Sequence, residues 1–168
     1  MGRIKIYNYK SLDSTNDEAK KLITSESEYI IYTKKQKNGR GQYDRKWLSK
    51  NGLTFSIVLK KENSNYSSIV PIAIKNYFKE KGIEVTIKQP NDIYYNNKKL
   101  GGILVENVYC EDKYDKTIIG IGLNINEDKI IENKVENAIC INIDEDDEII
   151  MQKIYEEIIN ITKEVNKI

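Results

Sequence analysis

The 168-residue sequence contains no histidine. This absence excludes nucleophilic catalysis by Ser–His or Cys–His pairs, and it excludes hydrolases that hold their metal through histidine. The two cysteines, Cys110 and Cys140, lack the spacing of metal ligands, and we expect both to be reduced, buried side chains. An enzyme of this composition would work mainly by positioning and by charge stabilisation with Lys, Arg and backbone amides.

The sequence also lacks an excess charge and a long hydrophobic run. Its formal net charge is +1, so a general affinity for nucleic acid is not indicated. No segment approaches the length of a membrane span, and the N-terminus has no signal-peptide core. We therefore expect a cytoplasmic protein with neither nucleic acid nor membrane as a partner. The length predicts a single domain over residues 1–168.

Arginine is scarce as well, because lysine supplies most of the positive charge. Two of the three arginines, Arg40 and Arg45, lie within residues 38–47 together with the only tryptophan. Arginine offers a rigid fork of donors, which favours a site that grips a phosphate or a carboxylate. Gly39 and Gly41 flank Arg40, so the backbone there can adopt positive φ and let its N–H groups approach a ligand closely. A solvated basic hairpin tip is the structural alternative.

Hydrophobic periodicity predicts an alternation of strands and helices along the chain. Strands are expected at residues 3–9, 29–35, 53–60, 84–88, 99–106, 117–126 and 137–143. Helices are expected from about residue 14, with Ala19, Leu22 and Ile23 as the apolar face, and at residues 67–81 and 144–168. Residues 38–47 and 128–136 are expected to be loops.

Short polar residues open the first helix. Thr15 with Glu18 has the form of a capping box, and Ser14 with Asp17 is a second possible register. The triplet 14–16 therefore has a sufficient structural explanation as a cap. A helix N-terminus also presents free N–H donors, so the same residues could bind a small ligand.

Polar residues and glycines also occur at the ends of later strands. Pro90 forces a turn that aims Asn91 and Asp92 at one place. Lys99 precedes a strand interrupted by paired glycines, which suggest close approach of a ligand or of another backbone. An exposed strand-edge lysine is the ordinary alternative for Lys99. The strand at 117–126 carries glycines and ends near Asn124.

Five such motifs, in this order and spacing, resemble the biotin–protein ligases, which are related to the lipoate ligases. The resemblance covers nearly the whole chain. It is carried by Ser14-Thr15-Asn16, by Gln36 with Gly39-Arg40-Gly41-Gln42-Tyr43-Asp44-Arg45-Lys46-Trp47, by Lys88-Gln89-Pro90-Asn91-Asp92, by Lys99-Leu100-Gly101-Gly102-Ile103-Leu104-Val105-Glu106, and by Gly120-Ile121-Gly122-Leu123-Asn124.

The resemblance implies an α+β fold: a mixed, largely antiparallel sheet with helices mainly on one face. It implies joining of biotin and ATP to give biotinyl-5′-AMP and pyrophosphate, followed by transfer of biotin to a lysine of a biotin carboxyl carrier domain. Mg²⁺ is implied with ATP, and Asp92 is its candidate ligand. A homodimer is left open, because pairing between sheet edges is not visible in the periodicity.

The resemblance also implies roles for individual residues. Arg40 and Lys99 are the expected catalytic cations. Expected contacts to biotin are Ser14, Thr15, Asn16, Gln36, Gly39, Arg40, Gly41, Gln42, Lys99 and Gly102. Expected contacts to ATP and the adenylate are Arg45, Trp47, Asn91, Asp92, Gly122 and Asn124. Plain core burial is the alternative for Trp47.

The chain departs from the family pattern in three places. Gln42 replaces a second arginine, which predicts weaker retention of the adenylate and labelling of bystander lysines. Gln89 replaces a tryptophan, which predicts looser packing under the turn. The sequence stops at Ile168, where most relatives continue into a small barrel-like domain, and no DNA-binding helix-turn-helix precedes the motifs, so repressor activity is not expected.

Three other functions fit parts of the pattern. A lipoate or octanoate ligase would share the core but lacks this arginine-rich loop. A degraded module would bind biotin or an acceptor domain without catalysis. An RNA-binding domain would use the basic loop, against the small net charge.

Overall fold

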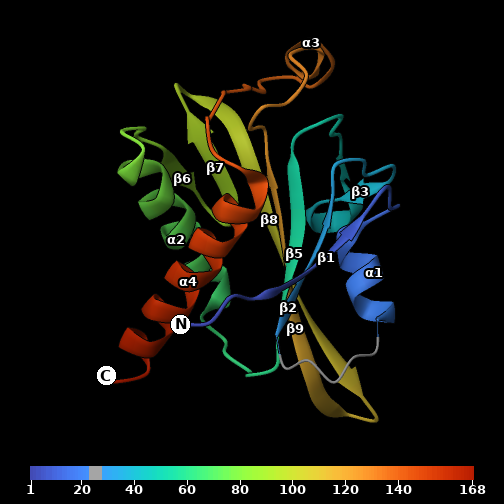
Figure 1. Ribbon diagram of the computed structural model, residues 1–168, viewed down its shortest axis with the longest axis vertical. Helices are drawn as coiled ribbons and strands as arrows, with labels where there is room; N and C mark the ends of the chain where they lie inside the picture. Colours follow the sequence, from blue (N-terminus) through green and yellow to red (C-terminus); the bar gives the residue numbers. More distant parts are fainter. Residues whose placement is uncertain (23–27) are drawn as a thin grey trace.

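Seven strands form one mixed sheet in a computed structural model that describes residues 1–22 and 28–168. Across the sheet the strands are β1 (Lys5–Tyr9), β2 (Tyr29–Thr33), β5 (Leu53–Leu59), β9 (Lys113–Leu123), β8 (Lys98–Cys110), β7 (Asp92–Tyr95) and β6 (Thr86–Lys88). Only β1 and β2 pair in parallel, and every other neighbouring pair is antiparallel. The predicted mixed, largely antiparallel sheet is therefore confirmed (Figure 1).

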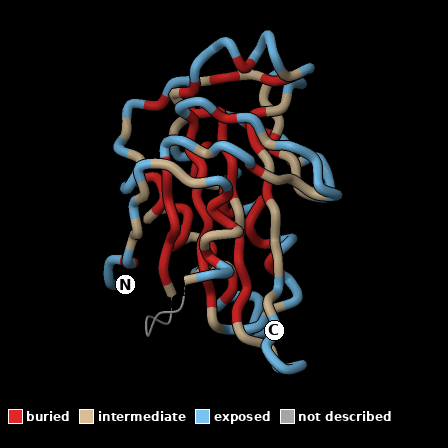
Figure 2. The backbone as a smooth tube through the Cα atoms, turned by 90° about the vertical axis from the view of Figure 1, so that its right-hand side faces the viewer, coloured by how far each residue is buried: buried red, intermediate tan, exposed pale blue. Residues whose placement is uncertain are grey.

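The central strands are covered on both faces. Every residue of β2 and β5 is buried, and Figure 2 shows the buried backbone concentrated in the middle of the sheet. Successive side chains of a strand point to opposite faces. Accordingly, Phe55 and Ile57 join the larger hydrophobic core, whereas Val58 joins a smaller core on the other face.

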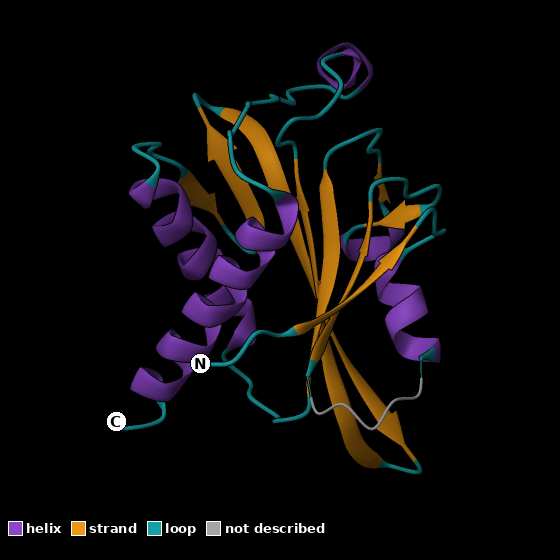
Figure 3. Ribbon diagram, viewed as in Figure 1, coloured by secondary structure: helices purple, strands orange, loops and turns teal. Residues whose placement is uncertain are grey.

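Two long helices cover the first face. They are α2 (Tyr66–Glu80) and α4 (Asp147–Val165), which lie side by side on the sheet (Figure 3). Their apolar stripes bury residues such as Ile74 and Ile154 in the larger core. Gly82 follows α2 with φ of +73°, the left-handed position expected after a helix end. Helices mainly on one face are thus confirmed.

The short helix α1 (Thr15–Lys21) packs on the opposite face. Ala19 buries its apolar side against the smaller core. Ser14 is the N-cap, and its side chain accepts a hydrogen bond from the Asp17 backbone N–H at 3.3 Å. The helix is therefore capped by Ser14, in the second of the two predicted registers, and the first register, with Thr15 as the cap, is wrong. Ile23, expected on the apolar side of this helix, lies outside the described residues.

Four local expectations are corrected by the structure. Residues 38–47 are not only a loop, because β3 (Gly39–Arg40) and β4 (Lys46–Trp47) pair as a hairpin around the short 3₁₀ turn η1 (Gln42–Asp44). Residues 128–136 include helix α3 (Ile130–Lys134). Residues 137–143 make isolated bridges and no strand. Cys140 is buried as expected, but Cys110 is exposed.

Within the residues that the structure describes, no helix is both long enough and apolar enough to cross a membrane.

Candidate functional site

A cavity of about 470 Å³ lies on the α1 side of the sheet. Its walls come from the start of α1, the β3–β4 hairpin, the turn at residues 88–92, and strands β5, β8 and β9. A cavity of this size suits a small-molecule ligand. Of the sixteen predicted site residues, fourteen line it: Ser14, Thr15, Asn16, Gln36, Arg40, Gly41, Gln42, Arg45, Trp47, Asn91, Asp92, Lys99, Gly102 and Gly122.

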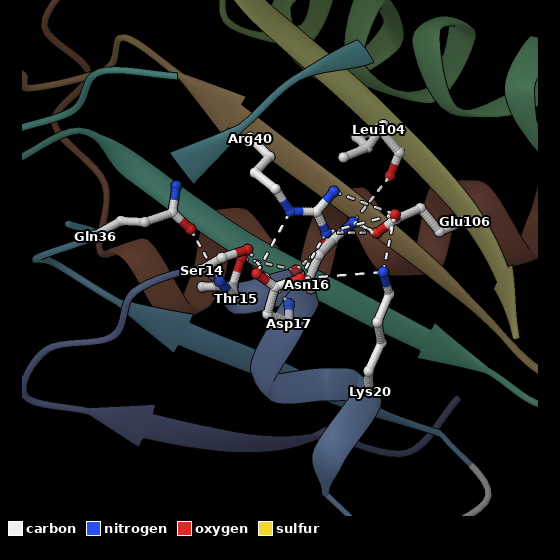
Figure 4. A network of polar contacts seen from close by, with 10 residues as sticks. Ser14, Thr15, Asn16, Asp17, Lys20, Gln36, Arg40, Leu104 and Glu106 are labelled. Atoms are coloured by element: carbon white, nitrogen blue, oxygen red, sulfur yellow. Dashed lines mark hydrogen bonds and ion pairs between the residues drawn. The ribbon is translucent and has the colours of Figure 1, made fainter. Parts of the chain in front are cut away.

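The Arg40 side chain joins the hairpin to two other elements. One of its terminal nitrogens lies 2.6 Å from Asp17 Oδ1 on α1 and 3.2 Å from Glu106 Oε2 on β8 (Figure 4). The hydrogen bond to Asp17, assisted by Glu106, raises the pKa of the guanidinium above its ordinary value. In this structure the Arg40 charge is therefore balanced by two carboxylates at the cavity wall.

Glu106 is the meeting point of several donors. Its carboxylate accepts hydrogen bonds from Asn16 at 2.8 Å and from Lys20 at 3.0 Å, besides those from Arg40. Burial acts to raise the pKa of Glu106, but these three hydrogen bonds outweigh it and the pKa is lowered. Glu106 is thus held as a carboxylate.

The polar residues at the start of α1 are held from two sides. The Thr15 backbone N–H donates to Gln36 Oε1 at 2.9 Å. Ser56, from β5 beneath the helix, lies 2.7 Å from Thr15 Oγ1 and 2.5 Å from Asn16 Oδ1. Gly120 leaves room for this arrangement, because a Cβ atom there would lie 2.5 Å from Asn16 Oδ1.

Lys99 reaches the cavity from strand β8. Its Nζ lies 2.9 Å from Asp92 Oδ1 and 5.8 Å from the centre of the Trp47 ring. The side chain is 31% exposed, so Lys99 is half-buried and the alternative of a fully solvated strand-edge lysine is wrong. Lys99 and Arg40 line the same cavity from different elements.

Trp47 is packed on the floor of the cavity. A Cβ atom at Gly122 would lie 2.5 Å from the indole, so a glycine is needed there for the ring to lie on β9. Trp47 Nε1 is buried and has no hydrogen-bond partner among the described residues. The ring lines the cavity, and core burial alone does not describe it.

Two predicted site residues do not line the cavity. Gly39 packs behind it, where a Cβ atom would lie 2.3 Å from Gln36 Nε2 and 2.6 Å from the Trp47 carbonyl oxygen. Asn124 is buried, and its backbone N–H and side-chain amide donate to the carbonyls of Leu100 and Lys99. Asn124 therefore holds the strand that carries Lys99.

The hairpin glycines do not use their freedom to adopt positive φ. Gly41 has φ of −109°, and Gly39 also lies outside the positive region. The hairpin turns instead at Tyr43 and Asp44, which both have φ of 56°. Gly39 is required by close packing, whereas a Cβ atom at Gly41 would meet nothing closer than 3.6 Å.

Sequence reasoning did not assign a site role to Asp17, Ser56 and Glu106, which hold lining residues in place by hydrogen bonds and ion pairs. Glu106 ends the motif at residues 99–106, but its role depends on Arg40, 66 residues earlier in the chain. Asp17 follows the polar triplet and resembles an ordinary first-turn acid. Ser56 interrupts an apolar strand, and a polar residue at a buried position was the available signal.

The cavity combines two kinds of polar group. Ser14, Thr15 and Gln36 contribute uncharged hydrogen-bonding groups, and Lys99 contributes a cation 5.8 Å from the centre of the Trp47 ring. Such a site suits a ligand that has a polar, neutral part and an anionic part. Arg45 adds a cation at the exposed rim.

Comparison with known proteins points to one family. A profile of the biotin/lipoate A/B protein ligase family matches residues 9–124. The bifunctional ligase/repressor BirA of Bacillus subtilis is 34% identical over 137 residues, which cover 76% of this chain and 42% of BirA. The chain thus spans less than half of that relative's length.

Solved structures agree. An arginine-to-glycine mutant of the biotin protein ligase from Aquifex aeolicus, in complex with biotin, superposes with a TM-score of 0.81 at 28% identity, covering 98% of this chain and 72% of that chain. The Aquifex aeolicus ligase in complex with biotin and ATP superposes with a TM-score of 0.77 at 27% identity, covering 93% and 69%.

Proposed function

Because the chain belongs to the biotin/lipoate A/B protein ligase family, we propose that it is an ATP-dependent biotin–protein ligase. Its first reaction joins the carboxylate of biotin to the α-phosphorus of ATP, with pyrophosphate leaving. In the second, a lysine amine of a biotin carboxyl carrier domain attacks the activated carbonyl carbon, and AMP leaves. The observation that carries the proposal is that Lys99 and Arg40 line one cavity with the polar triplet at residues 14–16.

The first reaction brings two anions together. Two unit charges about 4 Å apart repel each other by roughly 4 kcal/mol at an effective dielectric constant near 20. A fixed cation between them offsets this repulsion and stabilises charge that builds at phosphorus. Lys99 suits this role, because its half-buried ammonium faces the cavity beside Trp47. Neither histidine nor a covalent nucleophile is required.

Arg40 acts here through position as well as charge. Its guanidinium is engaged by Asp17 and Glu106, and it fixes the hairpin against α1 and β8. Gly41 and Gln42 of the hairpin line the cavity, where they would lie against the bound acid. We propose two roles for Arg40. It holds the hairpin in place over biotin, and it contacts the adenylate when Asp17 and Glu106 release its guanidinium.

The neutral head of biotin fits the part of the cavity formed by Ser14, Thr15 and Gln36, and its carboxylate would then reach toward Lys99. The nucleotide would occupy the part formed by Trp47, Asn91 and Gly122, with Arg45 at the rim. Asn124 supports this arrangement from behind through the Lys99 backbone.

Magnesium fits the site only as an ion carried by ATP. No group of three or more His, Cys, Asp or Glu side chains that could hold a metal occurs in the described part of the chain. Mg²⁺ needs only one or two carboxylates when phosphate oxygens and water supply its other ligands. Asp92, which lines the cavity, would be that carboxylate, and the ion would neutralise charge on the phosphates.

The direct test is incubation of the protein with biotin, ATP and Mg²⁺, followed by mass detection of biotinyl-5′-AMP. Mixtures without ATP and mixtures with Lys99→Gln are the controls, and both should yield little or no adenylate. Addition of a biotin carboxyl carrier domain should then give a product heavier by one biotinyl group. If calorimetry shows biotin binding but no adenylate is formed, the proposed ligase activity is contradicted. The chain would then be a module that binds biotin without catalysis.

Biotin and lipoate are distinguished by competition. In an ATP–pyrophosphate exchange assay, biotin should support exchange at concentrations where lipoate and octanoate do not. Faster exchange with lipoate would assign the chain to the other branch of the family.

A further inference from the structure

One buried carboxylate holds the segment that follows the hairpin. Glu127, in the loop between β9 and α3, is 6% exposed. Its Oε2 accepts a hydrogen bond from the Ser49 hydroxyl at 2.7 Å, and its Oε1 accepts from the Asn51 backbone N–H at 2.6 Å. The Lys50 N–H lies 3.0 Å from both carboxylate oxygens, and the Asp128 N–H donates at 2.8 Å. The segment after the hairpin therefore wraps around this carboxylate.

The contact requires a carboxylate at this position. All of these hydrogen bonds come from uncharged donors, three backbone N–H groups and one hydroxyl. A carboxylate has about four lone-pair positions and no proton, so it can accept from all of them. A glutamine would keep a single acceptor oxygen and would turn its own NH₂ group toward the remaining N–H groups. Because unpaired buried donors are costly, the segment would then have to move away to find water.

Both sides of the contact are shaped for it. Gly52 has no side chain at a place where a Cβ atom would lie 2.7 Å from Glu127 Oε2 and 3.0 Å from the Leu123 carbonyl oxygen. Asn126, with φ of 52°, accepts from the Ile143 N–H at 2.9 Å and donates to the Ile143 carbonyl at 2.8 Å. The loop that carries Glu127 is thereby tied to the segment before α4.

The anchored segment follows directly after Trp47. The Trp47 indole lies on Gly122 of β9, and Glu127 follows the end of the same strand. The hairpin is therefore joined to β9 and its following loop at two successive points. Only Leu48 separates Trp47 from the anchored segment, and Leu48 is 43% exposed, so it contributes little packing of its own. Over so short a connection, loss of the Glu127 contact should loosen the indole as well.

We propose that Glu127 is a positioning residue for adenylate formation, which acts through Trp47 by fixing the C-terminal base of the hairpin. This inference rests on the proposed function, in which the nucleotide lies against the Trp47 ring. Glu127 does not line the cavity, so it acts only through the hairpin. Its loss should therefore raise the KM for ATP and leave kcat nearly unchanged, because Lys99 stays in place on β8.

Trp47 provides its own measurement, because it is the only tryptophan in the sequence. We would record acrylamide quenching of its fluorescence, together with kcat and the KM for ATP in adenylate formation. Glu127→Gln should raise the quenching constant about twofold or more and the KM about tenfold or more, with kcat within about threefold of the parent. Gly52→Ala crowds the carboxylate from the other side and should have the same effects.

The matched control is Asp128→Asn, which removes the same charge from the next residue. Its side chain accepts from the Ile130 N–H of α3, so it does not hold the hairpin. It should leave the quenching constant and the KM unchanged. A circular dichroism spectrum and a thermal melt of each variant establish that the fold is retained.

Chemical rescue tests the anchor directly. Glu127→Ala leaves the three N–H groups and the Ser49 hydroxyl around a space that formate, a free carboxylate, can enter. Sodium formate should restore the parent's quenching constant and KM, whereas sodium chloride at the same ionic strength should not.

The outcomes separate this inference from the proposed function. Parent-like quenching and KM in Glu127→Gln overturn the role of Glu127 while the ligase assignment stands. A lowered melting temperature with parent-like quenching also overturns it, since Glu127 would then only stabilise the fold. If Glu127→Ala does not fold, the pair Glu127→Gln and Asp128→Asn decides. If the parent makes no adenylate, the proposed function fails, and the quenching comparison still decides whether Glu127 holds Trp47.

Discussion

The Trp47 indole lies directly on the backbone of Gly122, where a Cβ atom would be 2.5 Å from the ring. Trp47 belongs to β4 of the hairpin, and Gly122 lies on β9 in the middle of the sheet, paired with Gly102 on β8. This contact therefore attaches the hairpin over the cavity to the floor beneath it. It also explains why a glycine occupies a strand position where a larger residue would otherwise stabilise the sheet.

Replacing this glycine should displace the ring. We expect Gly122→Ala to raise the KM for ATP or biotin by about tenfold or more, because the new methyl group and the indole cannot both fit without a shift of the hairpin. The measurement is steady-state adenylate formation, with circular dichroism to establish that the sheet is retained.

Gly2→Ala is the control, because Gly2 lies outside the cavity lining. A Cβ atom there would meet nothing within 4 Å. Its effect should stay below about threefold, since nothing has to move. Equal losses in the two variants would contradict the special role of the Trp47–Gly122 contact.

Removal of the Lys99 charge should affect chemistry much more than stability. Lys99→Gln should slow adenylate formation by about 100-fold or more, the usual scale for losing a group that stabilises developing charge. The Lys99–Asp92 pair is partly exposed, so its contribution to folding is no more than about 1 kcal/mol. Single-turnover kinetics and a thermal melt would measure the two effects.

Lys98→Gln provides the comparison, because Lys98 is the exposed neighbour of Lys99 on the same strand. It should leave the rate within about twofold. A rate for Lys99→Gln as high as that of Lys98→Gln would rule out Lys99 as the charge-stabilising group.

Arg40 should control how often the hairpin opens. Lysine at this position keeps one charge but cannot bridge Asp17 and Glu106 together. We expect Arg40→Lys to weaken this clamp by about 1 kcal/mol, equivalent to roughly fivefold faster trypsin cleavage after Arg45. Limited proteolysis with mass detection of the first cut is the measurement.

Arg3→Lys is the corresponding control, because Arg3 is 79% exposed and lies 3.9 Å from its partner Glu148. The rate of the first cut in the hairpin should be unchanged by it. If Arg40→Lys also leaves the cleavage rate unchanged, the hairpin does not depend on the clamp.

Most of the residues that line the cavity could be predicted from the sequence, because they lie at strand ends and turns that have recognisable local patterns. Strand periodicity located β5 and β9, and turn residues located Asn91 and Asp92. Family resemblance then supplied the intervals between motifs. Asn124 was misplaced because a buried side chain that supports Lys99 from behind follows the same pattern as one that faces a ligand.

Pairings between distant residues could not be read from periodicity. Ser56 meets Asn16 across 40 positions, and Arg40 meets Glu106 across 66. The same limit explains residues 137–143, where alternation suggested a strand but the backbone makes only isolated bridges at Ala138 and Ile141. Alternation predicts which side chains share one face of an extended segment. It does not predict whether another strand is available to pair with that segment, because this depends on the fold.

Acid stability should depend on Glu145, away from the cavity. Burial acts to raise its pKa, but hydrogen bonds from Lys153 at 2.5 Å, Tyr77 at 2.8 Å, and Lys81 at 3.0 Å outweigh burial and lower the pKa to about 2. Because the folded pKa lies below the unfolded one, this stabilisation is present above about pH 4.5 and is lost as the pH falls toward about 2.

Urea unfolding at several pH values would measure this dependence. Glu145→Gln should lower the free energy of unfolding at pH 7 by up to about 3 kcal/mol and flatten its decline between about pH 4.5 and 2. The exposed Glu111→Gln variant is the control and should keep the decline of the parent. A parallel decline in Glu145→Gln and the parent would show that other carboxylates set the acid limit.

Gln42 should determine how long the adenylate stays bound. It lines the cavity at the start of η1. The family resemblance implies a second arginine at this position. Loss of that cation weakens the hold on the phosphate, so free adenylate should escape and acylate surface lysines of other proteins, with AMP as the leaving group.

We expect the parent chain, with biotin and ATP, to label an added bystander protein, and Gln42→Arg to reduce that labelling about tenfold or more while adenylate formation continues. Ser67→Arg adds the same charge at an exposed position on α2 and should leave labelling unchanged. Streptavidin blotting of the bystander measures labelling, and filtration followed by mass detection measures the adenylate that remains bound. A bystander that stays unlabelled while the parent makes adenylate would mean that the hairpin retains the intermediate without the second arginine.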